Sequence, residues 1–260
     1  MLDAPVSILM PSCNEADVIR DVVEEWVTEV MSRLPEGSEM VFDDCSNDGT
    51  TEILQELSEK YPFLRFSHCE RDGFLKSALR LYRGARCPLV FFTDSDGQYP
   101  ASEFWRIAEH IADHDMVHGY KVSRQDTKFR LFVSYVFNRL VRIMFGPGHD
   151  VNSAFRLIKR PILDAVLDDL GIMPMMPNAE MYMRLRKMSH DIRDIPIRHR
   201  ERAFGISRGF PGLSLYIISI RTSFDLIRIW LDVERSMRRD KKDSSPLVTA
   251  TEKPRGGHDV

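Results

Sequence analysis

An apolar run at residues 89–93 ends directly in two carboxylates, Asp94 and Asp96, and this junction constrains the fold more than any other segment. A short, fully apolar run that stops at a polar turn is typical of a strand buried on both faces of a parallel sheet. Such a strand brings hard oxygen ligands to the edge of a cleft, where Mg²⁺ or Mn²⁺ can bind them together with a diphosphate. An isolated Asp-x-Asp more often forms a plain acidic turn. The rest of the chain therefore has to distinguish a metal site from a simple turn.

Two other uses of this acidic pair conflict with its spacing. A calcium loop of the EF-hand type needs glycine sixth and glutamate twelfth, whereas Gly97 is fourth and Trp105 is twelfth when Asp94 is counted as first. A phosphatase of the haloacid-dehalogenase type needs a threonine two residues after its second aspartate, where this chain has Gln98. The sequence therefore fits neither an EF-hand calcium loop nor a phosphatase of this type.

Two further apolar runs also end in polar loops. Residues 6–10 lead into Pro11-Ser12-Cys13-Asn14-Glu15, and residues 40–42 lead into the acidic loop 43–50. Each loop is followed by apolar residues at helical spacing, which predicts a unit of strand, loop and helix. Ligands of open parallel sheets collect beyond the carboxyl ends of the strands, so these loops should line one crevice. The expected fold is therefore α/β, a mostly parallel sheet flanked by helices.

Together with later motifs, these loops resemble the family 2 inverting glycosyltransferases of the GT-A fold, and most of all the dolichol-phosphate mannose synthase and polyprenyl-phosphate glycosyltransferase group. The matching residues keep the family's order from about residue 5 to residue 210. They are Pro11-x-x-Asn14-Glu15, Asp43-Asp44-x-Ser46-x-Asp48-Gly49-Thr50, Asp94-x-Asp96-x-Gln98-x-Pro100, Gly119-x-Lys121, Arg130 with Ser134, Asp150-x-Asn152-Ser153-x-Phe155-Arg156, and Arg202-x-x-Gly205-x-Ser207. The chain departs from the pattern at Cys13, Lys121 and Ala154, where the family usually has tyrosine or phenylalanine, arginine, and glycine.

The resemblance implies transfer of a sugar from a GDP- or UDP-linked donor to a polyprenyl phosphate of the dolichyl type. It implies that Glu15 and Asp44 hold the base and ribose, and that Mg²⁺ or Mn²⁺ lies at Asp94, Asp96 and Gln98. The remaining substrate-binding positions are Pro11, Cys13, Lys76, Ser134, Arg156 and Ser207. The positions expected to be catalytic are Asp96, Lys121, Arg130 and Arg202, of which the three cations would neutralise anionic oxygens. Structural roles stay open for Lys76, in a helix-starting turn, and for Arg156, in an ion pair.

The acceptor decides whether the reaction needs a base. A hydroxyl acceptor requires a nearby carboxylate, whereas a phosphate monoester, with a second pKa near ~6, arrives already ionised. In relatives that use a hydroxyl, the base is commonly the second acid of a pair, but here Glu180 is followed by Met181. This favours a phosphate acceptor. Two alternatives stay open: a soluble hydroxyl acceptor such as a small molecule or glycan, with Asp150 or Glu180 as base, and a non-catalytic nucleotide-sugar binding protein.

Composition and charge limit which partners and which cell compartment fit this protein. The formal net charge of -3 argues against a nucleic-acid partner, and the four cysteines lack CxxC spacing, which fits a reducing cytoplasm. The N-terminus has no basic segment followed by an apolar core, so we expect no signal peptide.

Two apolar segments leave room for a peripheral position on the cytoplasmic face of a membrane. Neither 129–145 nor 213–231 reaches the roughly 18 apolar residues of a membrane span, but the second mixes apolar and basic residues at helical spacing. Both could bury against lipid, the chain's own core or a second subunit in a homo-oligomer. We expect a catalytic domain over residues 1–210, an amphipathic helix over 211–242 and a disordered tail over 243–260.

Overall fold

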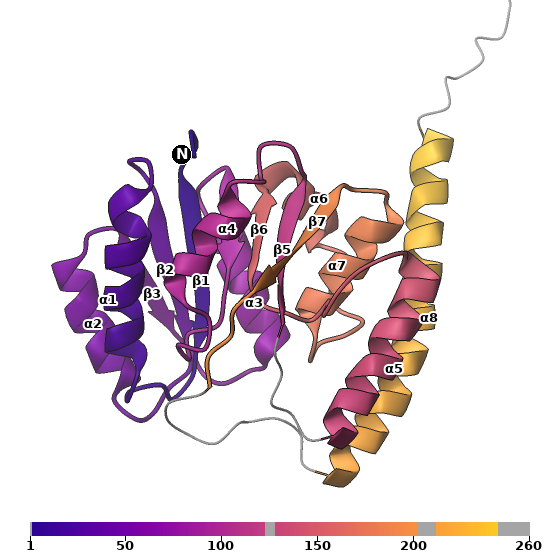
Figure 1. Ribbon diagram of the computed structural model, residues 1–260, viewed down its shortest axis with the longest axis horizontal. Coiled ribbons are helices and arrows are strands. Elements are labelled where there is room, and N and C mark those ends of the chain that lie inside the picture. The colour runs from indigo at the N-terminus through magenta and orange to yellow at the C-terminus, as the bar shows by residue number, and fades with distance from the viewer. Residues whose placement is uncertain (1, 123–127, 202–211, 244–260) are drawn as a thin grey trace, which may run out of the picture.

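The computed structural model describes residues 2–122, 128–201 and 212–243, and within these ranges it gives only the backbone of 128–133, 212–220, 223 and 240–243 (Figure 1). The described strands are β1 (Val6–Ser12), β2 (Glu39–Asp44), β3 (Leu64–His68), β4 (Leu89–Phe92), β5 (Met116–Lys121), β6 (Arg156–Lys159) and β7 (Ile192–Ile197). The described helices are α1 (Ile19–Glu29), α2 (Thr50–Lys60), α3 (Phe74–Gly84), α4 (Phe104–Ala108), α5 (Lys128–Phe145), α6 (Arg160–Leu167), α7 (Pro177–Lys187) and α8 (Gly212–Asp243), with short 3₁₀ turns η1 (Met31–Arg33) and η2 (Ala101–Glu103).

The described strands form a single sheet in the order β3-β2-β1-β4-β6-β5-β7. All neighbouring pairs are parallel except those of β6, which runs antiparallel between β4 and β5. The order reverses beside β1, where β2 lies on one side and β4 on the other. A crevice at the carboxyl ends of the strands is expected at such a reversal. The sequence-based prediction of a mostly parallel α/β sheet in one domain is confirmed.

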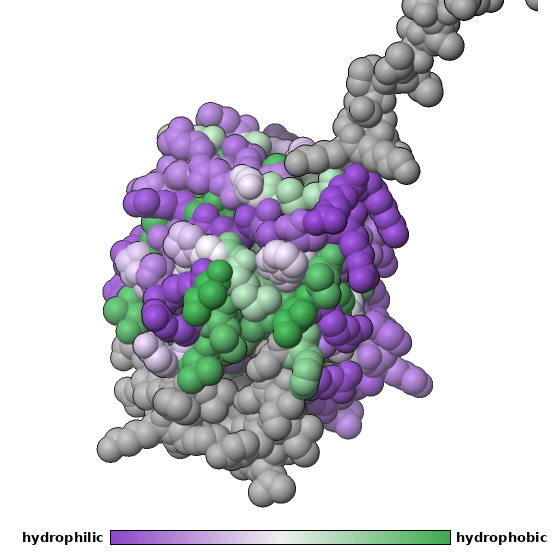
Figure 2. All heavy atoms as spheres, turned by 90° about the vertical axis from the view of Figure 1, so that its right-hand side faces the viewer, coloured by the Kyte–Doolittle hydropathy of each residue, from purple (hydrophilic) through white to green (hydrophobic). Residues whose placement is uncertain are grey.

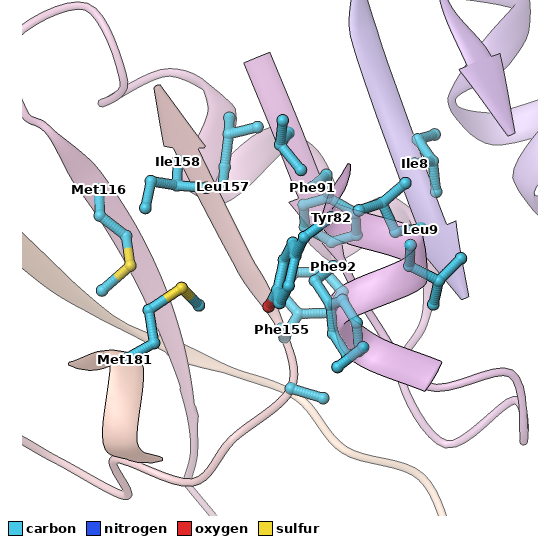
Figure 3. Close-up of a cluster of buried hydrophobic side chains, with 14 of the residues drawn as sticks. Ile8, Leu9, Tyr82, Phe91, Phe92, Met116, Phe155, Leu157, Ile158 and Met181 are labelled. Atoms are coloured by element: carbon cyan, nitrogen blue, oxygen red, sulfur yellow. The ribbon is translucent and has the colours of Figure 1, made fainter. Parts of the chain in front are cut away.

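Side chains on the two faces of β4 pack against the helices on each side of the sheet. Phe91 packs on one face against Trp26 of α1 and Phe104 of α4, with ring centroids 5.3 and 5.0 Å away. Phe92 packs on the other face against Tyr82 of α3, 5.1 Å away (Figure 3). Successive side chains of a strand point to opposite faces, so a strand with apolar residues at every position must be covered twice. This coverage on both faces explains the fully apolar run before Asp94.

The last helix, α8, lies beside α5 on the outside of α7 (Figure 1). Its inner face is attached to the domain through buried Leu226, Ile229 and Val233. Ion pairs with α7 add to this contact, with Arg184 Nη2 2.9 Å from Asp232 Oδ2 and Lys187 Nζ 2.6 Å from Glu234 Oε1. One face of α8 thus packs on the chain's own domain. Within the described residues, no helix is both long and apolar enough to cross a bilayer.

A buried histidine on β5 makes stability depend on pH. His118 is fully buried, and its Nε2 donates to the carbonyl oxygens of His149 and Asp150 at 3.2 and 3.1 Å. Burial, assisted by the nearby charge of Arg156, lowers the pKa of His118 to about 3. Unfolding lets the imidazole take up a proton below pH 6.5, while the folded protein does so only near pH 3. Stability is therefore lost as the pH falls from about 6.5 towards 3.

We expect acidification from pH 7 to pH 5 to cost wild type about 2 kcal/mol more unfolding free energy than the His118→Gln variant. Urea unfolding of both proteins at the two pH values measures this difference. Equal losses in wild type and variant would show that other groups, and not His118, cause the sensitivity to acid.

Candidate active site

The loops after β1 and β2 are joined by side-chain to backbone hydrogen bonds. The backbone N–H of Asn14 donates to Ser46 Oγ at 2.7 Å, and that of Glu15 donates to Thr50 Oγ1 at 3.0 Å. In return, the backbone N–H of Asn47 donates to Asn14 Oδ1 at 2.9 Å. Asn14 adopts a positive φ of 56°, which asparagine tolerates better than most residues. The two motifs thus fix each other's shape at the sheet edge.

Asp44 lies at the centre of this junction. Its carboxylate is fully buried and accepts hydrogen bonds from Ser12 Oγ (3.0 Å), Ser46 Oγ (2.5 Å) and Thr51 Oγ1 (2.6 Å), with His68 Nδ1 2.9 Å away. Burial opposes ionisation, but these hydrogen bonds outweigh it and lower the pKa of Asp44. Asp44 therefore stabilises the loops, and its neighbour in sequence, Asp43, faces the cavity instead.

A cavity of about 520 Å³ opens where β1, β2 and β4 end. The three loops expected to converge all contribute to its wall, together with the start of α3 and one residue before β6. The lining residues are Pro11, Ser12, Cys13, Glu15, Asp43, Cys45, Arg71, Asp72, Gly73, Phe74, Ser77, Arg80, Asp94, Ser95, Asp96, Gln98 and Asn152. The cavity has the size of a site for a small organic ligand.

The acidic corner of the cavity is formed by Asp94 and Asp96. Burial and the neighbouring charge of Asp96 raise the pKa of Asp94 to about 7, although Lys121 acts in the opposite direction. Asp96 Oδ1 accepts the backbone N–H of Gln98 at 3.1 Å, across Gly97, whose φ is +72°. Glycine adopts a positive φ readily, so the chain can turn here, and Asp94, Asp96 and Gln98 all line the cavity, with Gln98 Nε2 donating to the carbonyl oxygen of Arg200 at 3.2 Å.

This corner suits a hard divalent cation. Two carboxylates that repel each other are stabilised by a cation between them, and Mg²⁺ is commonly held by one or two carboxylates plus substrate phosphates and water. Among residues 2–122, 128–201 and 212–243, no cluster of three or more histidine, cysteine or acidic side chains forms a closed metal cage. Two acids with Gln98 therefore fit a metal whose other ligands come from the substrate.

A basic residue missed in the sequence, Arg80, shapes the opposite wall. Its Nε and Nη2 donate to the two carboxylate oxygens of Asp43 at 2.8 Å each, and its Nη1 donates to Asp72 at 2.8 Å. These acids raise the pKa of Arg80 further. The only sequence signal was helical spacing, because Arg80 follows Gly73 and Ser77 at steps of four and three. A pairing with a strand 37 residues earlier is not readable from that spacing.

Two cysteines face this part of the cavity. Cys13 Sγ donates to the carbonyl oxygen of Cys45 at 3.3 Å, and both residues line the cavity. Burial, together with the neighbouring Cys13, raises the pKa of the Cys45 thiol to about 12.

We expect saturating nucleoside diphosphate to slow alkylation of Cys13 by at least about tenfold, since a bound ligand excludes the reagent. Mass spectrometry after iodoacetamide treatment measures the rate at each cysteine. Cys69, which is not part of the cavity wall, is the internal control and should react equally with and without nucleotide. Unchanged labelling of Cys13 at saturation would place the nucleotide elsewhere.

Several residues expected at the site lie outside this cavity wall. Lys121 Nζ lies 5.0 Å above the ring of Tyr99, and its charge acts on Asp94. Lys76 is largely exposed on α3, with its ammonium 3.8 Å from Asp72. Ser134, on α5, accepts from Asn138 Nδ2 at 3.3 Å. The side chain of Arg130 and the whole of Arg202 and Ser207 fall outside the described residues.

The sequence left open whether Arg156 binds substrate or has a structural role, and in the structure it binds backbone carbonyl groups. Its guanidinium is fully buried and donates to backbone carbonyls of Asn178 (2.7 Å), Val151 (3.4 Å) and Ser153. It therefore does not touch the cavity directly. By holding the 151–153 segment, it positions Asn152, which does line the cavity.

The mostly parallel sheet, with acidic loops at its order reversal and helices on both faces, has the architecture of the GT-A fold. The family model described as glycosyl transferase family 2 matches residues 7–167. This match covers more than half of the chain, and the protein belongs to that family.

Solved structures show the same fold. Glucosyl-3-phosphoglycerate synthase from Mycobacterium tuberculosis, in complex with Mn²⁺, UDP and phosphoglyceric acid, is 16% identical with a TM-score of 0.66, over 88% of this chain and 79% of that one. A mannosyltransferase from Pyrobaculum calidifontis, in complex with GDP-Man and Mn²⁺, is 15% identical with a TM-score of 0.57, over 95% and 77%. Mannosyl-3-phosphoglycerate synthase from Rubrobacter xylanophilus is 12% identical with a TM-score of 0.59, over 96% and 78%.

Proposed function

We propose that this protein transfers a sugar, with inversion, from a GDP- or UDP-linked donor to a polyprenyl phosphate, as the dolichol-phosphate mannose synthase group does. Residues 1–210 would form the catalytic domain, with α8 attached to it and a tail beyond. The enzyme would act in the cytoplasm, at the surface of a membrane. Two of the similar structures named above carry Mn²⁺ with UDP or GDP-Man, which supports a divalent metal and a nucleotide sugar here.

The donor would occupy the 520 Å³ cavity. Its diphosphate would lie at Asp94, Asp96 and Gln98, which would hold Mg²⁺ or Mn²⁺. Pro11, Cys13 and Glu15 would contact the base and ribose, with Asp44 supporting this wall from behind. A bound divalent metal offsets the charge that builds up on the departing nucleoside diphosphate.

The main support is that Met181 stands where relatives that use a hydroxyl commonly have the base, and that Glu180, the acid beside it, cannot act as one. Its carboxylate is fully buried and accepts the backbone N–H of Met173 at 2.8 Å and both Nε and Nη2 of Arg184 at 3.1 and 3.0 Å. It is absent from the cavity wall. A phosphate acceptor needs no base, because it arrives ionised.

In this mechanism an acceptor phosphate oxygen attacks the anomeric carbon in line with the leaving group. The bond from that carbon to the donor phosphate breaks, and the nucleoside diphosphate leaves with the electron pair. Lys121, Arg130 and Arg202 would neutralise the anionic oxygens of the two phosphates. Asn152 would orient the donor, held in place by Arg156. Ser134 and Ser207 would contact the acceptor side, and Lys76 would attract the donor from its exposed position on α3.

A soluble acceptor is the second candidate. Two of the similar structures are phosphoglycerate glycosyl synthases by name, and one contains phosphoglyceric acid. An acceptor of this kind would use a hydroxyl, and Asp150 would then be the candidate base.

The test is release of nucleoside diphosphate with Mg²⁺ or Mn²⁺ from a panel of GDP- and UDP-sugars. Each donor is offered alone, with a short polyprenyl phosphate, and with 3-phosphoglycerate. Release that requires the polyprenyl phosphate supports the proposal and names the donor. Release that requires 3-phosphoglycerate supports the second candidate, and binding without release under all three conditions would indicate a non-catalytic protein.

A further inference from the structure

The outer surface of α5 and α8 is unusually apolar. Exposed large apolar side chains line both helices, and Figure 2 shows them gathered on one side of the molecule. On α5 they are Tyr135, Val136 and Ile143, with exposed fractions of 63%, 39% and 71%, and on α8 they are Phe224, Ile227 and Leu231, with 65%, 51% and 40%. We call this surface, with the exposed arginines among these residues, the α5–α8 face.

All other exposed residues described on these two helices are arginines. They are Arg139 and Arg142 on α5 and Arg221, Arg228, Arg235, Arg238 and Arg239 on α8. Among the described acidic side chains of the two helices, only Asp232 is largely exposed, at 47%, and its charge is paired with that of Arg184. The face therefore combines two properties only, apolar area and positive charge.

The described acidic side chains of α8 are held in ion pairs. Asp232 binds Arg184 of α7 at 2.9 Å, Glu234 binds Lys187 of α7 at 2.6 Å, and buried Asp225 binds Arg228 at 3.0 Å. Two of these pairs point towards the domain. The exposed charge of α5 and α8 is therefore mainly positive, although the whole chain carries a net charge of -3.

We infer that the α5–α8 face docks on an anionic lipid bilayer. A bilayer surface offers hydrocarbon below a layer of negative headgroups, and arginine can bury its aliphatic stem while its guanidinium reaches those headgroups. A second copy fits less well, since a two-fold interface would bring the same arginines together from both sides. Both helices begin on the side of the molecule where the parallel strands have their carboxyl ends (Figure 1).

Docking in this way would lay the bilayer along both helices, and because their first turns lie at the end of the molecule where the donor cavity opens, a lipid acceptor could reach the cavity from there (Figure 1). This consequence rests on the proposed lipid acceptor, whereas docking itself does not. The two are therefore tested by different readouts, vesicle binding for the surface and turnover for the function.

The experiment is co-sedimentation of the full chain with vesicles of phosphatidylcholine alone or with added phosphatidylglycerol. We expect binding to the anionic vesicles at least about tenfold stronger than to the neutral ones, weakening as salt is added. Arg221→Gln/Arg235→Gln should weaken anionic binding at least about tenfold. Phe224→Gln/Leu231→Gln should weaken it similarly by removing apolar contact with the hydrocarbon.

The matched control is Arg20→Gln/Lys60→Gln, which removes the same charge from α1 and α2 at the far end of the sheet. It should bind like wild type, and circular dichroism should show all variants folded. Equal binding to both vesicle types, or equal loss in the control, would overturn the inference. So would sedimentation velocity showing a dimer that Phe224→Gln/Leu231→Gln dissociates, because a second copy would then cover the face.

Turnover separates the two proposals. Arginine variants that lose vesicle binding should keep activity on a short polyprenyl phosphate in detergent, because they leave the cavity intact. Wild type that binds anionic vesicles but transfers no sugar to any lipid phosphate would overturn the proposed function and leave the docking surface standing.

Discussion

Replacing Asp96 with asparagine is expected to lower turnover by about a hundred- to a thousandfold while the protein stays folded. The substitution keeps the size of the side chain and removes one of only two carboxylates in the acidic corner of the cavity. A divalent metal shared with the donor diphosphate would then be held by Asp94 and neutral groups alone. The charge on the leaving group would lose its main support in the transition state.

Release of nucleoside diphosphate at saturating donor and metal measures this loss. The matched control is Asp72→Asn, an acid that also lines the cavity and whose carboxylate binds Arg80 at 2.8 Å. It should change turnover by less than about tenfold, since it lies away from the diphosphate corner. Full activity of Asp96→Asn, with wild-type dependence on Mn²⁺, would contradict the assignment of the metal site.

Replacing Glu180 with alanine is expected to cost about 3 to 5 kcal/mol of unfolding free energy, the largest stability effect of a single substitution that we foresee. Its carboxylate accepts backbone N–H groups of Gly171 and Ile172 at 3.2 Å and of Met173 at 2.8 Å, besides the buried Arg184. Alanine would leave these donors, including a buried guanidinium, without their acceptor.

Urea unfolding tests this loss, with Glu56→Ala as control. Glu56 also pairs with an arginine, Arg20, but both side chains are largely exposed, and such pairs contribute less than about 1 kcal/mol. The milder Glu180→Gln variant, measured per folded molecule, should keep turnover within about tenfold of wild type. A folded Glu180→Gln protein with a hundredfold loss would make Glu180 a base and favour a hydroxyl acceptor.

The local elements and their meeting point could be predicted from the sequence because they depend on short-range patterns. Apolar runs before Pro11, Asp43 and Asp94 indicated buried strands, and parallel strands place their carboxyl ends on one edge. The cavity wall contains residues from all three loops, as expected. Helical spacing after the first two loops also indicated α1 and α2, and the apolar segment 129–145 coincides with α5 (Lys128–Phe145).

The orientation of individual side chains could not be predicted in this way. Asp43 and Asp44 are neighbours on β2, yet Asp43 meets Arg80 at the cavity and Asp44 is enclosed by hydroxyl groups. Arg80 lies 37 residues after Asp43, and Ser12 lies 32 residues before Asp44, so short-range patterns do not reveal which acid faces which side. The pairing of α5 with α8 is likewise a tertiary contact, so two helices with separate apolar patterns gave no sign of one continuous surface.

The central claim is transfer of a sugar to a lipid phosphate, and the most direct measurement follows a radiolabelled sugar from its nucleotide donor into the organic phase. With Mn²⁺, wild type and a polyprenyl phosphate, we expect label in an organic-soluble product, and none when the lipid or the metal is left out or Asp96→Asn replaces wild type. Label that stays in water, as free sugar or on a soluble acceptor, while the enzyme turns over its donor would contradict the claim.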